Sequence, residues 1–140
     1  ALLLAALTLC LLLAGCGGQS KPANYADGTY TGRSLDHEDD EDGNGSGYGV
    51  VTLEIKDNKI TACEFVMYEL DGTVKDETYG ADLSKENRLK AQKAVQAAPK
   101  YASMLVSAGS ADKVDVISGA TISYSEFTEA VADALAQAAK

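Results

Sequence analysis

The chain of 140 residues carries 21 acidic and 12 basic side chains, which gives a formal net charge of −9. This length fits one domain with a modest hydrophobic core. Because no cluster of lysine and arginine offsets the acidic charge, nucleic acids and anionic lipid surfaces are poor partners for this chain. Composition therefore predicts one acidic domain, and any more specific function must come from motifs along the chain.

The first residues form an apolar run that stops at Gly15. The run is too short for a comfortable transmembrane helix. Its end, "LAGC", resembles the lipobox of bacterial lipoproteins, which implies that Cys16 is acylated once the peptide before it has been removed. We therefore expect a lipoprotein-type signal peptide over residues 1–15, truncated at its start, then the lipid-bearing Cys16 and a flexible tether over residues 16–26. The alternative is an ordinary signal peptide with a chance cysteine.

Processing at this point would remove Cys10 and place the lipid on Cys16, so that Cys63 would be the one cysteine left with a free thiol. We therefore expect no disulfide within the mature chain. Cys63 lies in a strand-like run and is predicted to be a small buried apolar residue. The single histidine, His37, lies in an acidic stretch, where we expect a solvated side chain.

Three strands are predicted after the tether, over residues 27–35, 47–56 and 59–70. In the second, Val51, Leu53 and Ile55 alternate with polar side chains, as in a strand with one covered face. The pair Asp57-Asn58 is a two-residue turn signal between the second and third strands. This pattern predicts an antiparallel meander.

Helical patterns follow. Ser84 can cap a helix over residues 85–98, and Pro99 suits the first turn of a second one over 99–109. Residues 113–117 read as a short apolar strand. The last helix is predicted to begin after Ser123, with an apolar stripe made by Phe127, Ala130, Val131, Ala134, Leu135 and Ala138. The predicted fold class is α+β, a small antiparallel sheet with helices packed on one face.

The acidic run over residues 36–47 resembles a calcium loop only in part. With Gly43 as the sixth residue of such a loop, Glu38, Asp40 and Asp42 fall at ligand positions. The twelfth position, which needs a bidentate glutamate, is Gly49. We therefore expect a solvated loop between strands and no metal site.

Just before the last helix stands the stretch "DVISGAT", from Asp115 to Thr121. Ser123 and Glu126 are already spaced as a capping box, which leaves the hydroxyl of Thr121 without a structural task. The stretch resembles the flavinylation signal of FMN-binding domains, an Asp, two variable residues, Ser or Thr, then Gly-Ala-Thr. Such domains occur in subunits of sodium-translocating NADH:quinone reductases and in lipoproteins of extracellular electron transfer.

In that family a transferase takes FMN from FAD and joins its phosphate to the last threonine of the motif. The resemblance covers about residues 27–139 and implies an FMN-binding domain over residues 27–140. It makes FMN the cofactor, Thr121 its attachment point, and Asp115 part of the signal that the transferase reads. A phosphate held there would meet the unpaired N–H groups of a helix start.

Further cofactor contacts are implied by the motif, by the start of the helix, and by a second stretch, "ETYG", which resembles the family's Glu-Thr-Pro-Gly. These contacts are Ser118, Gly119, Ala120, Ser123, Glu77 and Thr78. Tyr79 stands where that stretch usually has proline. Tyr79 and Tyr124 are the candidates to stack on the flavin.

No set of acid, base and nucleophile accompanies the motif, so the resemblance implies an electron carrier rather than a self-sufficient enzyme. Its implied partners are a flavin transferase that uses FAD and a membrane quinone or dehydrogenase as electron donor. The lipid on Cys16 would place it on the outer face of the bacterial cytoplasmic membrane or on another extracytoplasmic membrane surface. The alternative, of a different class, is a non-catalytic lipoprotein that binds a small ligand or a partner protein without flavin.

Overall fold

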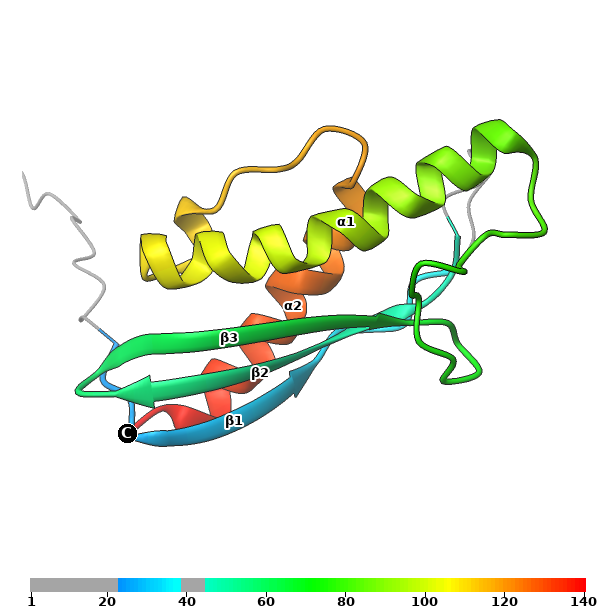
Figure 1. Cartoon of the computed structure of the whole chain (residues 1–140). Helices are drawn as coiled ribbons and strands as arrows, with labels where there is room; N and C mark the ends of the chain where they lie inside the picture. Colours follow the sequence, from blue (N-terminus) through cyan, green and yellow to red (C-terminus); the bar gives the residue numbers. More distant parts are fainter. Residues whose placement is uncertain (1–22, 39–44) are drawn as a thin grey trace, which may run out of the picture.

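The computed structural model describes residues 23–38 and 45–140. It contains a three-stranded antiparallel sheet and two long helices on one face of it, which confirms the predicted α+β class (Figure 1). The predicted signal peptide, Cys16 and most of the tether lie outside these residues. Within the described part of the chain, no helix is both long and apolar enough to cross a membrane.

The sheet is a meander of β1 (Gly28–Arg33), β2 (Tyr48–Lys56) and β3 (Lys59–Tyr68), in that order. The predicted turn between β2 and β3 is present, with φ of 51° at Asp57 and 60° at Asn58. Such left-handed values match the twist of paired strands in a tight hairpin. The three predicted strands are therefore confirmed, with ends shifted by no more than two residues.

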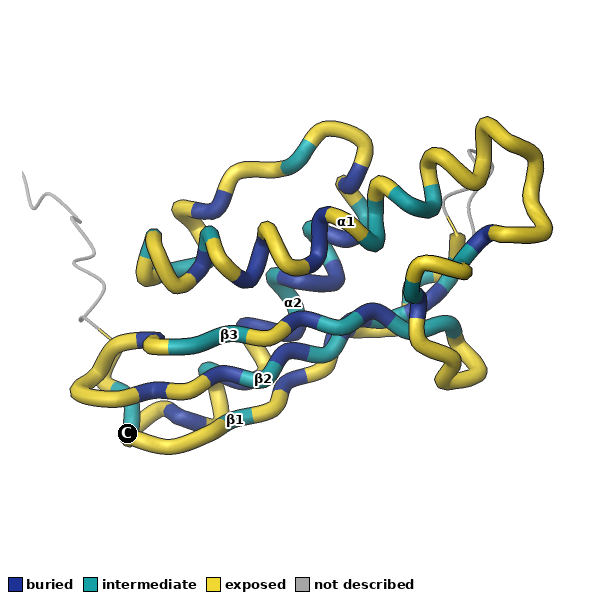
Figure 2. Tube along the Cα trace, viewed as in Figure 1, coloured by how far each residue is buried: buried dark blue, intermediate teal, exposed yellow. Residues whose placement is uncertain are grey.

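Alternation along β2 puts one set of side chains against the helices. Val51 and Leu53 are fully buried and Ile55 nearly so, as their spacing predicts. Figure 2 shows the buried residues of the strands and helices facing each other across the interior. The core is therefore a single layer between the sheet and the helices.

The last helix, α2 (Thr121–Ala138), lies directly on this layer. Of its predicted apolar stripe, Leu135 is half-buried and the other five side chains are fully buried. The helix comes so close to β1 that a Cβ on Gly32 would overlap the backbone of Ala130 and Ala134. A glycine in the strand thus allows close packing of α2.

The first helix, α1 (Lys85–Ala108), is continuous where two helices were predicted. Ser84 caps it as expected, its hydroxyl accepting a hydrogen bond of 3.3 Å from the Asn87 N–H. Pro99 lies inside it and removes one backbone hydrogen bond. Burial on both sides of the proline, by Ala97, Ala98, Tyr101, Ala102 and Leu105, outweighs that loss. The prediction of a break at Pro99 was wrong.

The segment before α2 is also different from its prediction. Residues 111–113 form a short 3₁₀ helix, η1 (Ala111–Lys113), and residues 114–117 are extended but unpaired. In Figure 1 this segment runs over α1, on the side away from the sheet. It cannot reach a strand edge from there, so the predicted strand over residues 113–117 does not form.

The first described residues are hydrogen-bonded to the end of the domain. The Ala26 N–H donates to the carbonyl of Ala138 over 2.8 Å, and the Lys140 N–H donates to the carbonyl of Asn24 over 2.9 Å. Asn58 receives a hydrogen bond from the Tyr25 N–H at 2.7 Å. Residues 23–26, predicted as the end of the tether, therefore lie against α2 and the β2–β3 turn.

Candidate functional site

The turn before α2 is held from inside by a buried tyrosine of α1. The hydroxyl of Tyr101 accepts a hydrogen bond from the Ile117 N–H at 2.9 Å and donates one to the carbonyl of Ala120 at 3.0 Å. Its ring stacks on Phe127 with centroids 5.5 Å apart. Burial raises the pKa of this hydroxyl, so it stays protonated and able to donate. Tyr101 thus spans the motif and fixes its shape.

The motif itself presents Thr121 at the first position of α2, with an exposed side chain. Gly119 has φ of +80°, a left-handed value that glycine adopts without strain. Ala120 precedes the helix as a buried cap residue without a polar side chain. The first N–H groups of α2 have no carbonyl partner within the helix, which favours an anion at this end.

Two polar residues, Ser123 and Glu126, were predicted to cap this helix, but neither of them does so. Ser123 and Glu126 both lie inside α2, with side chains 3 % and 1 % exposed. The helix begins two residues before Ser123, so its hydroxyl follows the helix start instead of preceding it. The predicted capping box was wrong, and whether Ser123 contacts a phosphate stays a prediction.

The second predicted stretch forms a polar turn after β3. Thr78 donates to one carboxylate oxygen of Asp76 from its hydroxyl at 2.7 Å and from its N–H at 2.8 Å. These two bonds, the side-chain one first, lower the pKa of Asp76. Glu77 and Thr78 are both exposed at the surface of this turn.

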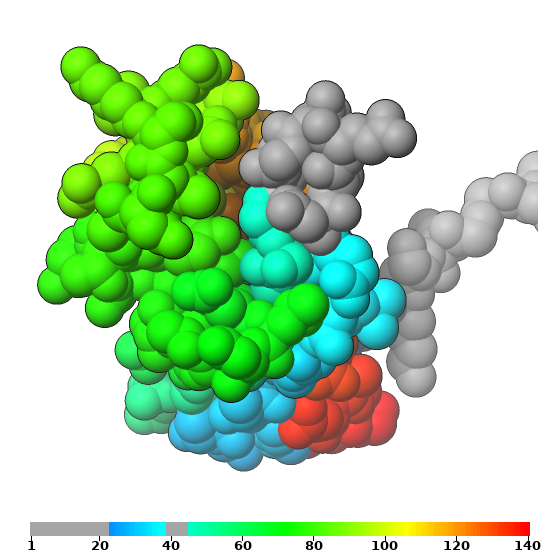
Figure 3. All heavy atoms as spheres, turned by 90° about the vertical axis from the view of Figure 1, so that its right-hand side faces the viewer, coloured from blue at the N-terminus to red at the C-terminus, as the bar shows by residue number. Residues whose placement is uncertain are grey.

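Helix α1 connects the two predicted stretches. Its Gln92 side chain donates to the carbonyls of Tyr79 at 2.8 Å and Asp76 at 3.2 Å. The next residue, Lys93, lies beside Gly119 of the motif. In Figure 3 a small orange area, the colour of residues near the start of α2, is visible beside the yellow-green of α1 and above the turquoise of the chain at the start of β2. The motif and the second stretch therefore flank one short part of α1.

Two candidate aromatic rings lie in different surroundings. Tyr124 is half-buried and packs against Tyr101, with ring centroids 5.7 Å apart. Tyr79 is half-buried and has the ammonium of Lys75 5.0 Å from its ring centroid. Both rings are already in contact with protein groups, and which of them stacks on a flavin stays a prediction.

A cluster of charged side chains, Glu126, Lys75, His37 and Glu129, lies near the start of α2. Glu126 and Lys75 are both buried, and one oxygen of Glu126, Oε1, has no hydrogen-bond partner among the described residues. His37 contacts Glu129 at 3.2 Å and is half-buried, so its predicted solvated state was wrong. Burial raises the pKa of Glu126. The nearby positive charges of Lys75 and His37 oppose that rise, whereas the negative charge of Glu129 adds to it.

We expect Glu126→Gln to stabilise the protein at neutral and alkaline pH. The pKa of Glu126 in the folded protein is raised above its ordinary value of 4.5. Its protonated form therefore contributes fully to the free energy of unfolding below pH 4.5, and this contribution is lost as the pH rises through the folded-state pKa. Glutamine keeps the shape and stays neutral, so the two proteins should agree in acid. Above the folded-state pKa the variant should gain on the order of 1 kcal/mol. Urea unfolding across pH measures the difference.

Exposed Glu54 provides the matched control, because Glu54→Gln removes the same charge from the surface of β2. The free energy of unfolding of Glu54→Gln should stay close to that of wild type at every pH. A wild type that is more stable than Glu126→Gln in alkali would contradict the prediction. It would mean that attraction to Lys75 and His37 outweighs the cost of burial.

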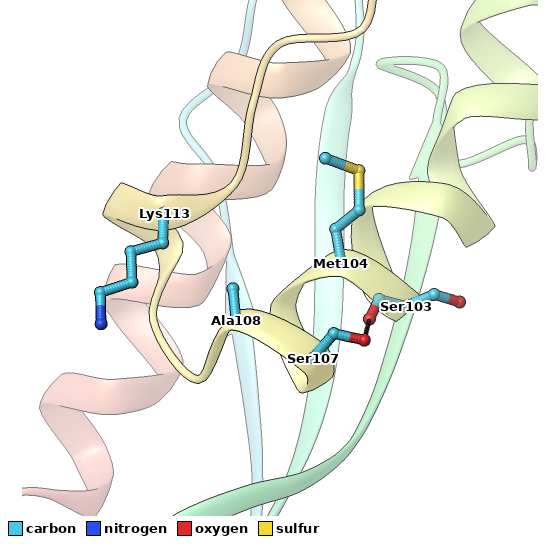
Figure 4. A pocket seen from close by; sticks show the side chains of 5 residues that line it. All are labelled: Ser103, Met104, Ser107, Ala108 and Lys113. Atoms are coloured by element: carbon cyan, nitrogen blue, oxygen red, sulfur yellow. Dashed lines mark hydrogen bonds between the residues drawn. The ribbon is translucent and has the colours of Figure 1, made fainter.

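Two other features do not take part in this site. Burial, with a smaller effect of Glu64, raises the pKa of the half-buried Cys63 thiol to about 11, so it stays protonated. An open hollow at the other end of α1 is lined by Ser103, Met104, Ser107, Ala108 and Lys113 (Figure 4). None of the predicted site residues lines it.

The sequence analysis missed Tyr101, Gln92 and Lys93, and it gave Glu126 only a capping role. Tyr101 and Glu126 have signals that could have revealed them: a tyrosine on an apolar helix stripe needs a partner for its hydroxyl, and a glutamate beside buried Phe127 is out of pattern. Gln92 and Lys93 have none, because polar residues on an exposed helix face are ordinary. Their roles follow only from the way α1 lies between two loops.

Together, the fold and the turn define a small α+β domain that presents one threonine hydroxyl at an open helix start. The family model of FMN-binding domains matches residues 44–136. The chain therefore belongs to the FMN-binding domain family, and FMN is its cofactor. The residues present fit such a group, because Gly119 and the helix start leave room and donors for a phosphate beside Thr121.

One solved structure supports the fold independently. The crystal structure of the CPE2226 protein from Clostridium perfringens matches with a TM-score of 0.59 and 22 % identity, over 81 % of this chain and 88 % of that chain. At this identity the likeness shows the fold alone. No curated protein matches the sequence.

Proposed function

We propose that this protein is a membrane-anchored electron carrier whose FMN is joined through its phosphate to Oγ1 of Thr121. The observation that carries the proposal is the exposed position of Thr121 at the first residue of α2, in a family that binds FMN. Bound FMN supplies the capacity to accept and release electrons. The chain supplies attachment, orientation and local charge.

Attachment would be a transfer from FAD by a separate transferase. A bond forms between Oγ1 of Thr121 and the flavin-side phosphorus, the pyrophosphate bond of FAD breaks, and AMP leaves. The hydroxyl proton goes to solvent. Asp115 is exposed on the segment before the turn, where a transferase can reach it. Tyr101 holds the turn during this reaction through its bonds to Ile117 and Ala120.

The direct test is the full chain produced with and without a flavin transferase. Intact mass should rise by one FMN less one water only when the transferase is present, and the yellow colour should survive denaturation and gel filtration. A protein that remains unmodified beside an active transferase would overturn covalent attachment. It would favour a binding lipoprotein instead.

Anchoring is a separate part of the proposal and has its own prediction. Cys16→Ala should abolish lipid attachment, so the chain should stay unprocessed or be released from membranes. Fractionation of cells with mass analysis of the amino terminus measures this. The substitution lies far in sequence from Thr121 and should leave flavin content per folded protein unchanged. A variant still cleaved at the same place and still membrane-bound would contradict the anchor.

A further inference from the structure

Lys93 lies across the turn of the motif. If Gly119 had a Cβ, that atom would lie 3.4 Å from Cδ and 3.8 Å from Nζ of Lys93. The glycine, with φ of +80°, leaves this surface of the turn bare, and the lysine side chain passes over it. Its ammonium therefore lies beside Gly119, two positions before Thr121.

This placement brings the exposed Lys93 side chain close to the start of α2. The start of α2 is the positive end of the helix dipole, where a cation is disfavoured and an anion is stabilised. Lys93 belongs to none of the ion pairs found between described residues, whereas Lys90, one turn earlier, lies 3.9 Å from Glu86. A negative group between Lys93 and the helix start would be attracted by the ammonium of Lys93 and by the positive end of the α2 dipole.

We propose that Lys93 is the cation that contacts the phosphate of the flavin attached at Thr121. This inference rests on the proposed function, and it assigns a binding role to a residue outside the motif. The phosphodiester would be held between the Lys93 ammonium, the N–H groups at the start of α2, and the bare surface of Gly119. Helix α1 then takes part in the site through its surface as well as through buried Tyr101.

The experiment compares the full chain with Lys93→Ala, Lys93→Arg and Lys90→Ala, each co-expressed with a flavin transferase and each also made with Thr121→Val. The melting temperature of each flavin-bearing protein is measured against that of its Thr121→Val counterpart. Flavin should stabilise wild type, Lys93→Arg and Lys90→Ala by similar amounts. Lys93→Ala should lose roughly 3 °C of this flavin-dependent stabilisation, and the loss should shrink in high salt.

The outcomes separate this inference from the proposed function. If wild type takes up no covalent flavin, the proposed function fails, and the role of Lys93 falls with it. If all four proteins are flavinylated and Lys93→Ala keeps the full flavin-dependent stabilisation, only the role of Lys93 is wrong. An equal effect of Lys93→Ala with and without flavin also overturns it. Should Lys93→Ala carry no flavin, recovery in Lys93→Arg supports the contact and failure to recover refutes it.

Discussion

Replacing Thr121 by valine is expected to abolish covalent flavin and to leave the fold intact. Valine has nearly the shape of threonine and a similar helix propensity, and it lacks only the oxygen that would form the phosphoester. The side chain is exposed, so the free energy of unfolding should change by no more than about 0.5 kcal/mol. Intact mass after denaturation measures attachment, and circular dichroism measures the fold.

Two further variants define the specificity of this result. Ser125→Ala removes another hydroxyl near the start of α2, outside the motif, and should still be flavinylated. Asp115→Ala should fold normally yet carry much less flavin, because its exposed carboxylate is the group that we propose the transferase recognises. Retention of covalent flavin by Thr121→Val would exclude Thr121 as the attachment point.

The sheet could be predicted closely from sequence because its signals are local. Alternation over Val51, Leu53 and Ile55 gives the buried face, and Asp57-Asn58 gives the turn and hence the register. Each of these signals spans only a few residues and needs no knowledge of distant contacts. The α+β class follows from the order of strands and helices.

The helices show where local signals are outweighed. Pro99 predicts a helix start, but packing of the stripe on both sides carries α1 through it. Residues 113–117 have a strand-like composition, but the chain places them over α1, away from any strand edge. Ser123 looks like a cap, yet the left-handed turn at Gly119 starts the helix earlier. Tertiary contacts decide the first two cases, and a local pattern does not contain them; the third is decided by the backbone turn at Gly119.

The candidate site also has one part that the sequence predicts and another that only the fold reveals. Asp115 to Thr121 is a contiguous motif, so sequence alone identifies it. The groups beside it come from α1, where Lys93 lies next to Gly119 and Tyr101 is hydrogen-bonded to Ile117 and Ala120. Only the packing of α1 against two loops brings them together. The motif therefore predicts which atom is modified, and the fold explains how that atom is held.

The second large effect is expected at Tyr101, where Tyr101→Phe removes one oxygen from the core. The stacking on Phe127 is kept, but the half-buried Ile117 N–H loses its partner and the Ala120 carbonyl loses one of its two donors. The two lost hydrogen bonds contribute about 1 kcal/mol each, so the melting temperature should fall by roughly 8 °C. The turn should also loosen, and flavinylation by the transferase should slow at temperatures where the variant is folded.

Tyr124→Phe provides the matched control for that prediction. Tyr124 packs against Tyr101, but its hydroxyl has no hydrogen-bond partner among the described residues, so its loss should change stability little. Hydrogen exchange separates a local from a general effect: in Tyr101→Phe the Ile117 amide should lose protection before the amides of β2 do. If Ile117 keeps its protection, or if both phenylalanine variants lose the same stability, the hydroxyl of Tyr101 does not hold the turn. If the turn loosens while the flavinylation rate stays that of wild type, the motif is recognised as a flexible segment, and its preformed shape serves the bound flavin and not the transfer reaction.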